Sequence, residues 1–424
     1  MGKKFFIGIL AVVLASAAVY GVYRVADRML NVLFPSGMTS SAVSRSGAAS
    51  SSPSSAAQSS SSAVSSGSAS SASTSSAPVT AVLPGIFSDY ADQAQSRLSQ
   101  MTLKEKVGQV FLFTCPASGA ISTIDTCQPA GYCLFARDFQ NKTAAQVKKT
   151  LASYQNSSKI PMLLCCDEEG GTVVRVSQFP ALAARPFASP QEVFASGGMA
   201  AITADTVKKA QLLKSLGLNL NIAPVCDVST NPNDFINARS FGKNAAQTAQ
   251  FVTASVAAYQ SQGLACTLKH FPGYGNNADT HTGIARDARS YQSFQQSDFV
   301  PFEAGIKAGA PCVMVCHNIV ECMDAKRPAS LSPQVHDILR NALGFTGVIV
   351  SDSLSMQAVK DYTNGQDPCV EAFLAGNDLL LTSDNLNGFN ALYAAVQKGK
   401  VSEKRLNASV LRILAWKYQA GILK

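Results

Sequence analysis

Charged side chains are scarce in this sequence. Asp, Glu, Lys and Arg make up 15% of the 424 residues, whereas 46% are hydrophobic, and the formal net charge is only +8. The basic residues are scattered and form no runs, so the sequence does not have the pattern of a nucleic-acid-binding protein. The high apolar content excludes a chain that is disordered throughout. The length permits two or three domains, or a single α/β barrel of about 250 residues or more.

A pair of Cys-x-x-Cys motifs is also missing, which argues against a structural zinc site. Eleven cysteines would suggest disulfides in an exported protein. Cys115, Cys127 and Cys133 lie close together in a loop-rich stretch, where one bridge could form. Six others lie in apolar runs and are expected to be small buried hydrophobic residues: Cys165, Cys166, Cys226, Cys266, Cys312 and Cys316.

Leucine, isoleucine and aromatic residues are absent from residues 36–81, which are almost entirely Ser, Ala, Gly, Thr, Pro and Val. Such a segment cannot bury enough apolar surface to fold, so residues 29–84 are predicted to be a disordered Ser/Ala-rich linker. As a flexible tether it would span roughly 35 to 40 Å on average, enough to reach through a cell-wall layer. The alternative is a low-complexity insert without a role.

The first residues resemble an export segment. Lys3 and Lys4 precede an uncharged run over residues 5–23, which is typical of a segment that enters the membrane with its basic end in the cytoplasm. Ala15-Ser16-Ala17 is a candidate signal-peptidase site, but the run is also about long enough to span a bilayer uncleaved. Residues 1–28 are therefore a signal peptide or an N-terminal membrane anchor. Either alternative predicts an extracytoplasmic protein, secreted or anchored at the cell surface.

From residue 89 onward, short apolar runs alternate with longer amphipathic segments. Helical spacing is clear in residues 143–156, 245–263 and 333–344. Parallel strands that are apolar on both faces and each followed by a helix predict a (β/α)8 TIM barrel over residues 85–424. A doubly wound open sheet is the alternative, but the first strand is not followed by its glycine-rich phosphate turn. The eight expected strands lie in residues 107–113, 131–136, 161–166, 218–225, 265–271, 311–317, 347–352 and 377–382.

Ionisable side chains follow five of these strands at their carboxyl ends. The carboxyl ends of barrel strands meet at one face, which carries the chemistry in this fold, so residues far apart in sequence should converge there. Singly, an Asp in such a position is often only a helix N-cap, and Asp227 is the example most open to that interpretation. His336, in contrast, lies within an expected helix and is predicted at the surface. The side chains at strand ends are Asp167, Asp227, Lys269, His270, His317 and Asp352.

Several motifs resemble those of glycoside hydrolase family 3, in particular its single-domain β-N-acetylhexosaminidases of the NagZ type. The resemblance extends over about 335 residues, which include all of these motifs. It implies a (β/α)8 barrel, in agreement with the strand pattern, and no metal or organic cofactor. The motifs read, in order, LSQMTLKEKVGQVF from residue 98, DEEGGTVVRV from 167, LNLNIAPVCDV from 218, ARSFG from 238, LKHFPGYG from 268 and VIVSDSLSM from 348.

The resemblance also implies the roles of individual residues. Asp352 would be the nucleophile of a retaining mechanism that forms a covalent glycosyl-enzyme, since a carboxylate suits a cationic transition state. Asp279 and His281, on the loop after the fifth strand, would form the acid/base dyad: the carboxylate orients the imidazole, and the imidazole exchanges protons near neutral pH. Four residues at motif positions would bind the sugar hydroxyls: Asp167, Arg239, Lys269 and His270. His317, at the carboxyl end of its strand, is expected to bind the sugar with them.

The sequence departs from the family pattern at two positions. Tyr274 replaces the second histidine of KHFPGHG, and Thr172 stands where many relatives have an arginine. The first change affects the loop of the dyad, and the second affects the neighbouring wall of the pocket. Neither removes an expected catalytic group.

The sequence thus predicts a glycosidase that releases terminal β-linked N-acetylglucosamine from peptidoglycan fragments or related glycans. The expected partners are this carbohydrate, and a membrane if the N-terminal segment is retained; a monomer is expected, with a final helix over residues 405–424. One alternative is a phosphorylase of the same glycosides, because a neutral imidazole does not repel phosphate as a carboxylate would. The other is a surface glycan-binding protein without catalysis, against which the retention of Asp352, Asp279 and His281 argues.

Overall fold

A computed structural model describes residues 83–280, 283–360, 362–363 and 365–424. The expected export segment, nearly all of the linker and His281 lie outside these residues. Leu83 is buried in the hydrophobic core, so the folded part includes residues from this position onward. No helix within the described residues is long and apolar enough to cross a membrane.

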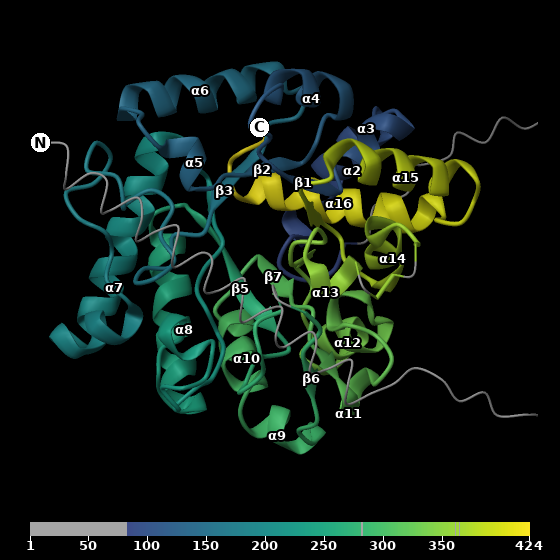
Figure 1. Cartoon of the computed structure of the whole chain (residues 1–424). Helices are drawn as coiled ribbons and strands as arrows, with labels where there is room; N and C mark the ends of the chain where they lie inside the picture. The colour runs from purple at the N-terminus through teal and green to yellow at the C-terminus, as the bar shows by residue number, and fades with distance from the viewer. Residues whose placement is uncertain (1–82, 281–282, 361, 364) are drawn as a thin grey trace, which may run out of the picture. The chain divides into compact units, whose positions relative to one another are not determined.

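Eight parallel strands form the centre of the domain (Figure 1). Their order in the sheet is β10-β1-β2-β3-β4-β5-β7-β9. The two outer strands also meet, through a parallel bridge between Val350 and Leu379 and a hydrogen bond from the Ser351 N–H to the Leu379 carbonyl. The sheet is thus a nearly closed barrel surrounded by helices, consistent with a (β/α)8 barrel. The strands are β1 (Phe111–Thr114), β2 (Gly131–Cys133), β3 (Leu163–Cys166), β4 (Leu220–Asn221), β5 (Ala265–Phe271), β7 (Cys312–Val315), β9 (Val348–Ser351) and β10 (Leu380–Thr382).

All eight expected strands are present, because each apolar run is buried on both faces of the barrel wall. The first strand is shorter than expected, since residues 103–108 are helical and Thr102 and Glu105 form a capping box there. A separate small sheet pairs β6 (Arg286–Asp287) with β8 (Ile319–Val320). It connects the segments that follow β5 and β7.

Helices surround the strands (Figure 1). Capping side chains set where many of them begin: Thr143 and Ser189 each form a capping box. Gly197 and Gly198 interrupt α7 with non-helical backbone. The larger helices are α2 (Ala91–Ser99), α3 (Leu103–Gly108), α4 (Ala120–Cys127), α6 (Ala144–Ser157), α7 (Pro190–Leu216), α8 (Ala245–Ser261), α9 (Tyr291–Gln296), α10 (Phe299–Lys307), α14 (Pro368–Ala375), α15 (Asn385–Gln397) and α16 (Glu403–Gln419).

Shorter turns complete the fold. The expected helix over residues 333–344 is divided, because α12 continues as a π-helical turn. His336 is buried rather than at the surface: its Nδ1 lies 2.8 Å from the Ser332 carbonyl oxygen, and burial lowers the pKa of its imidazole. The short elements are α5 (Ala136–Phe139), α11 (Glu321–Asp324), α12 (Pro333–Asp337), α13 (Gln357–Lys360), the π-helical turn Ile338–Ala342, and 3-10 turns at Ser88–Tyr90, Asn237–Arg239 and Ala329–Leu331.

A buried ion cluster lies at the end of the barrel where β10 begins. The Asp378 carboxylate accepts hydrogen bonds from Arg340, from Arg412 at 2.7 Å and from the Ser409 hydroxyl at 2.7 Å. Arg405 lies 3.8 Å from the same carboxylate. Burial alone would raise the pKa of Asp378, but the three arginines outweigh it and hold the pKa well below its usual range. The cluster connects β10 to α16 and to the turn after α12.

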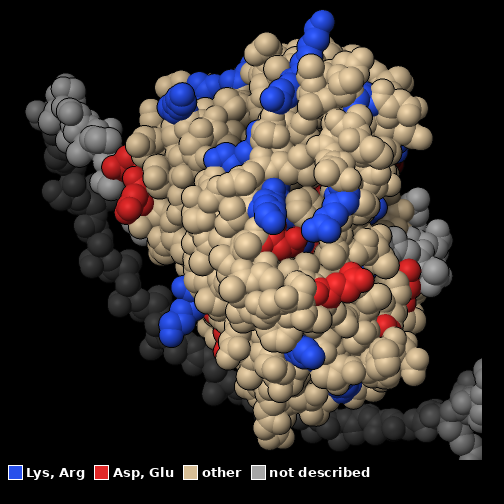
Figure 2. Space-filling model, turned by 90° about the vertical axis from the view of Figure 1, so that its left-hand side faces the viewer, with Lys and Arg blue, Asp and Glu red and all other residues tan. Residues whose placement is uncertain are grey.

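All eleven cysteines lie in the described part of the chain, and none of them forms a disulfide there. The bridge considered for Cys115, Cys127 and Cys133 is therefore not formed. Cys322 is exposed and the other ten are buried, which confirms the burial expected for the six cysteines in apolar runs. Basic side chains are spread over one face of the molecule in Figure 2, with acidic side chains between them. This agrees with the scattered basic residues of the sequence.

Candidate active site

A cavity of about 310 Å³ is bordered by residues near the carboxyl ends of the barrel strands and in the segments that follow them. Its polar lining comes from β5 and from the segments that follow β3, β4, β5 and β9. Apolar side chains such as Phe135, Met314 and Leu381 complete the wall. The ionisable side chains that border it are Asp167, Arg175, Arg239, Lys269, His270, Tyr274 and Asp352.

Lys269 lies at the centre of the charged residues. Its side chain is only 1% exposed, and its Nζ lies 2.7 Å from Asp167 Oδ1 and 2.5 Å from Glu169 Oε1. Burial would lower the pKa of this ammonium, but the two carboxylates outweigh burial and raise the pKa above its ordinary value. Lys269 is therefore a permanent cation at neutral pH, held by one carboxylate that borders the cavity and one behind it.

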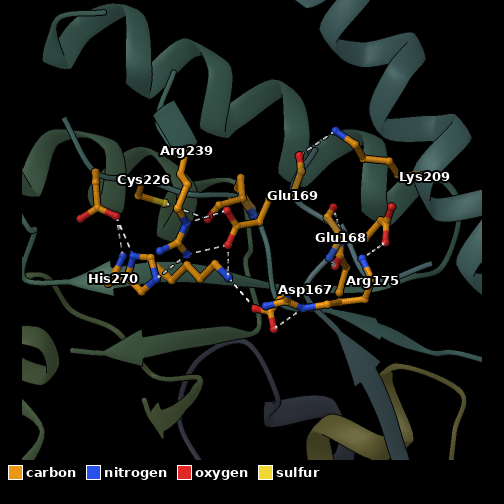
Figure 3. A network of polar contacts seen from close by, with 12 residues as sticks. Asp167, Glu168, Glu169, Arg175, Lys209, Cys226, Arg239 and His270 are labelled. Atoms are coloured by element: carbon orange, nitrogen blue, oxygen red, sulfur yellow. Dashed lines mark hydrogen bonds and ion pairs between the residues drawn. The ribbon is translucent and has the colours of Figure 1, made fainter. Parts of the chain in front are cut away.

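Glu169 is the second partner of Lys269, and it also holds Arg239. The guanidinium binds it in a bidentate manner, with Nε 3.0 Å from Oε2 and Nη2 2.7 Å from Oε1 (Figure 3). Burial would raise the pKa of Glu169, but the charges of Lys269 and Arg239 outweigh it and hold the pKa well below its usual range. One buried carboxylate thus orients two cations toward the cavity.

His270 is held between Asp227 and Arg239. Its Nδ1 lies 2.7 Å from Asp227 Oδ2, and its Nε2 lies 3.2 Å from Arg239 Nη2. Because a guanidinium can only donate, Nε2 must accept, which places the ring proton on Nδ1, where it is donated to Asp227. Asp227 also accepts the backbone N–H of Tyr274 at 2.8 Å. It is therefore not a helix N-cap but a support for the segment that begins with His270.

The DEEGG sequence after β3 forms a turn whose Glu168, Glu169 and Gly170 are buried. Glu168 is fully buried and accepts the backbone N–H groups of Arg175, Val176 and Ser177 at 2.8, 2.8 and 3.2 Å. Gly170 has a φ of 100°, and a Cβ there would lie 2.2 Å from the Ala188 carbonyl, so the turn requires glycine. Arg175 returns to the cavity, with its Nε 4.0 Å from Asp167 Oδ2.

Asp352 follows β9 and borders the same cavity. Its backbone N–H donates to the Val315 carbonyl at 2.9 Å, and its Oδ1 accepts the Ser353 N–H at 2.7 Å. His317 supports this turn: its Nε2 donates to the Ser353 carbonyl at 3.0 Å, and its Nδ1 lies 2.7 Å from the Ser330 hydroxyl. The described lining of the cavity does not include His317, so this residue lies behind the turn that carries Asp352.

The structure thus brings together five of the eight residues expected at the site: Asp167, Arg239, Lys269, His270 and Asp352. Asp279 lies half-buried in the loop after β5, and its partner His281 is outside the described residues. Within the described chain, no group of three or more His, Cys, Asp or Glu side chains is arranged to hold a metal ion.

Sequence reasoning did not assign a role to Glu168, Glu169 or Arg175. A signal was available for the first two, because they directly follow Asp167 at the end of β3. Arg175 lies in the same DEEGGTVVRV motif, but it is eight residues beyond Asp167 and does not stand at a strand end. Tyr274 was singled out only as a departure from the family pattern, yet its ring borders the cavity.

Known proteins resemble this chain in sequence and in fold. A beta-hexosaminidase A from Pseudoalteromonas piscicida is 32% identical over 67% of this chain, which spans only 52% of that protein. A beta-hexosaminidase from Xanthomonas oryzae is 38% identical over 54% of this chain and 69% of its own length. A solved glycoside hydrolase family 3 beta-N-acetylglucosaminidase from Paenibacillus sp. has a TM-score of 0.70 and 30% identity, over 76% of this chain and 63% of that one. Residues 99–416 match the glycosyl hydrolase family 3 N-terminal domain, and the chain therefore belongs to this family.

Proposed function

We propose that this protein is a retaining glycoside hydrolase that releases terminal β-linked N-acetylglucosamine from peptidoglycan fragments or related glycans. The observation that carries the proposal is that Asp352 borders one cavity together with Asp167, Lys269 and Arg239. The names of the relatives, beta-hexosaminidase and beta-N-acetylglucosaminidase, support it. A volume of about 310 Å³ is at the small end for ligand pockets and suits a single sugar ring.

Asp352 acts as the nucleophile in this proposal. Its carboxylate attacks the anomeric carbon and forms a glycosyl ester while the leaving oxygen departs, and water then hydrolyses the ester. The Ser353 N–H and the support from His317 fix the carboxylate before the reaction begins. Such preorganisation lowers the cost of reaching the transition state.

The charged residues bind the sugar hydroxyls. Lys269 uses two of its three N–H donors on Asp167 and Glu169, which leaves one for a hydroxyl. Asp167 is partly exposed and accepts from a second hydroxyl. Both nitrogens of His270 have protein partners, so we assign it a contact through its ring edge and the task of orienting Arg239.

Asp279 and His281 supply the proton in this scheme. The Asp279 carboxylate orients the imidazole, which protonates the leaving oxygen and then accepts a proton from water. No metal or organic cofactor is required by these steps. We further propose that the enzyme acts outside the cytoplasm as a monomer, anchored or secreted through residues 1–28, with residues 29–84 as its tether.

Kinetics on an aryl β-N-acetylglucosaminide test the assignment. Asp352→Ala should lower kcat/KM at least about a thousandfold, because no other carboxylate takes the place of the nucleophile. His281→Ala should lose least with leaving groups that need no proton. Asp92→Asn, at an exposed position of α2, is the matched control and should remain like the wild type.

The same assay separates the alternatives. Each variant is measured with and without inorganic phosphate, and the products are analysed for the sugar 1-phosphate. A phosphate-dependent 1-phosphate product would make the protein a phosphorylase, and a wild type that binds the glycoside without turnover would make it a glycan-binding protein. Activity of Asp352→Ala equal to that of the wild type would refute the assignment.

A further inference from the structure

Within the loop after β5, two buried hydroxyls meet. Tyr274 and Thr280 are 1% and 0% exposed, and their side-chain oxygens lie 2.5 Å apart. The contact joins the beginning of the loop, next to His270, to the residue that directly follows Asp279. A hydrogen bond between two buried side chains is costly to break from one side, because the remaining hydroxyl keeps no partner.

Tyr274 is itself fixed on several sides. Its N–H donates to Asp227, the same carboxylate that holds His270. Its ring packs edge-on against His270 with 5.3 Å between centroids, and its carbonyl accepts the Asn277 side-chain amide at 2.8 Å. The ring also borders the cavity that contains Asp352. Tyr274 is thus held by several contacts at the beginning of the loop, and Thr280 lies further along the same loop.

The electrostatic surroundings keep this hydroxyl neutral. Burial, and then the negative charge of Asp352, raise the pKa of Tyr274 above its ordinary value. The phenol therefore stays protonated under the conditions in which a glycosidase works, and is able to donate as well as accept.

We propose that Tyr274 is a positioning residue for the acid/base loop: through its hydrogen bond to Thr280 it fixes the Asp279–Thr280 stretch next to Tyr274, which itself borders the cavity. Adjacent Cα atoms are about 3.8 Å apart, so anchoring Thr280 restricts where the Asp279 carboxylate can lie. A general acid contributes only when its geometry is correct, and a displacement of about 1 Å can cost about a hundredfold in rate. The inference rests on the proposed function, in which Asp279 orients the imidazole that transfers the proton.

A comparison of leaving groups tests the inference. kcat/KM, which reports the first chemical step, is measured for a 2,4-dinitrophenyl and a 4-methoxyphenyl β-N-acetylglucosaminide. Tyr274→Phe and Thr280→Val should each lower the value about 10- to 100-fold for the methoxyphenyl substrate, which needs a proton, and less than about threefold for the dinitrophenyl substrate. Thr280→Ser keeps the hydroxyl, so its kcat/KM for the methoxyphenyl substrate should be close to that of the wild type.

Two further variants complete the design. The double variant Tyr274→Phe/Thr280→Val should have a kcat/KM no lower than that of the less active single variant, because both changes remove the same hydrogen bond. Tyr132→Phe is the matched control, because it also removes a tyrosine hydroxyl from the protein interior, one that donates to the Ala120 carbonyl. Its kcat/KM for both substrates should stay within about twofold of the wild-type values.

The outcomes separate this inference from the proposed function. If the wild type hydrolyses neither substrate, the proposed function fails. If the wild type is active and Tyr274→Phe loses equally on both substrates, or on neither, Tyr274 only packs and the inference is overturned.

Discussion

Two buried ion clusters lie at opposite ends of the barrel, and they differ in what surrounds them. At the carboxyl ends of the strands, Lys269 is shared by Asp167 and Glu169 next to a cavity. At the beginning of β10, Asp378 is enclosed by three arginines. Those arginines also donate to backbone carbonyls at the ends of neighbouring elements, for example Arg340 to Phe345 and Arg405 to Asn377.

The difference concerns what the ion pairs at each end of the barrel connect. In the cluster around Asp378, called the lower cluster, the charges connect β10 to α16 and to the turn after α12, and none of its residues borders the cavity at the carboxyl ends of the strands. In the cluster around Lys269, called the upper cluster, Asp167, Arg239 and Lys269 border the cavity, where our proposal places the sugar. In barrel enzymes this division, with chemistry at the carboxyl ends and stability at the opposite face, is general.

Replacing the lower carboxylate should have the largest effect on stability. Asp378→Asn removes the one carboxylate of the described chain with which the three partly buried arginines form ion pairs. Because Asp378 itself is buried, breaking these pairs should cost about 3 to 5 kcal/mol of the free energy of unfolding. Urea denaturation measures it. The remaining folded enzyme should have the kcat/KM of the wild type, and a selective loss of activity without loss of stability would contradict the comparison.

A smaller effect on stability but a clear one on activity is expected at the upper cluster. Glu169→Gln leaves Lys269 with Asp167 and weakens the bidentate contact to Arg239, so we expect a loss of about 2 kcal/mol in the free energy of unfolding. kcat/KM should fall about 10- to 100-fold, because both cations lose their orientation. Glu403→Gln, at an exposed position of α16, is the control. A kcat/KM of Glu169→Gln equal to that of the wild type would contradict the idea that this cluster serves activity.

An effect on the pH dependence of stability, and none on activity, is expected at Lys417, a buried lysine whose described partner is neutral. Its Nζ donates to Gln109 Oε1 at 2.7 Å, and burial lowers its pKa from 10.5 to about 7. The unfolded chain therefore binds a proton between pH 10.5 and 7 while the folded one does not, so this group makes stability fall as the pH falls through that window.

Lys417→Met should remove this dependence. At pH 7 the variant should gain stability relative to the wild type, and the gain should shrink by about 2 kcal/mol at pH 9. Urea denaturation of both proteins at the two pH values measures the difference. A gain that is independent of pH would show that Lys417 is not neutral in the folded protein. Such a result would mean that a buried lysine of this barrel keeps its charge although its described partner is neutral.

The sequence was sufficient for the barrel and for much of the upper cluster, because both follow from local order. Apolar runs give the strands, and Asp167, Lys269 and Asp352 stand directly at their carboxyl ends. The lower cluster could not be predicted, since Arg340, Arg405 and Arg412 occur in helical segments where basic residues are usually exposed. His336 was misplaced for the same reason: a polar residue in a helix gives no local sign of being covered by its neighbours.

The enclosed thiols have a practical consequence. Burial raises the pKa of Cys115 to about 12 and that of Cys266 to about 12, which keeps them in the unreactive protonated form. Cys322 on α11 is the exposed exception. A maleimide fluorophore added to the native protein should attach at this single position without mutagenesis, which gives a spectroscopic reporter beside the strand pair β6 and β8.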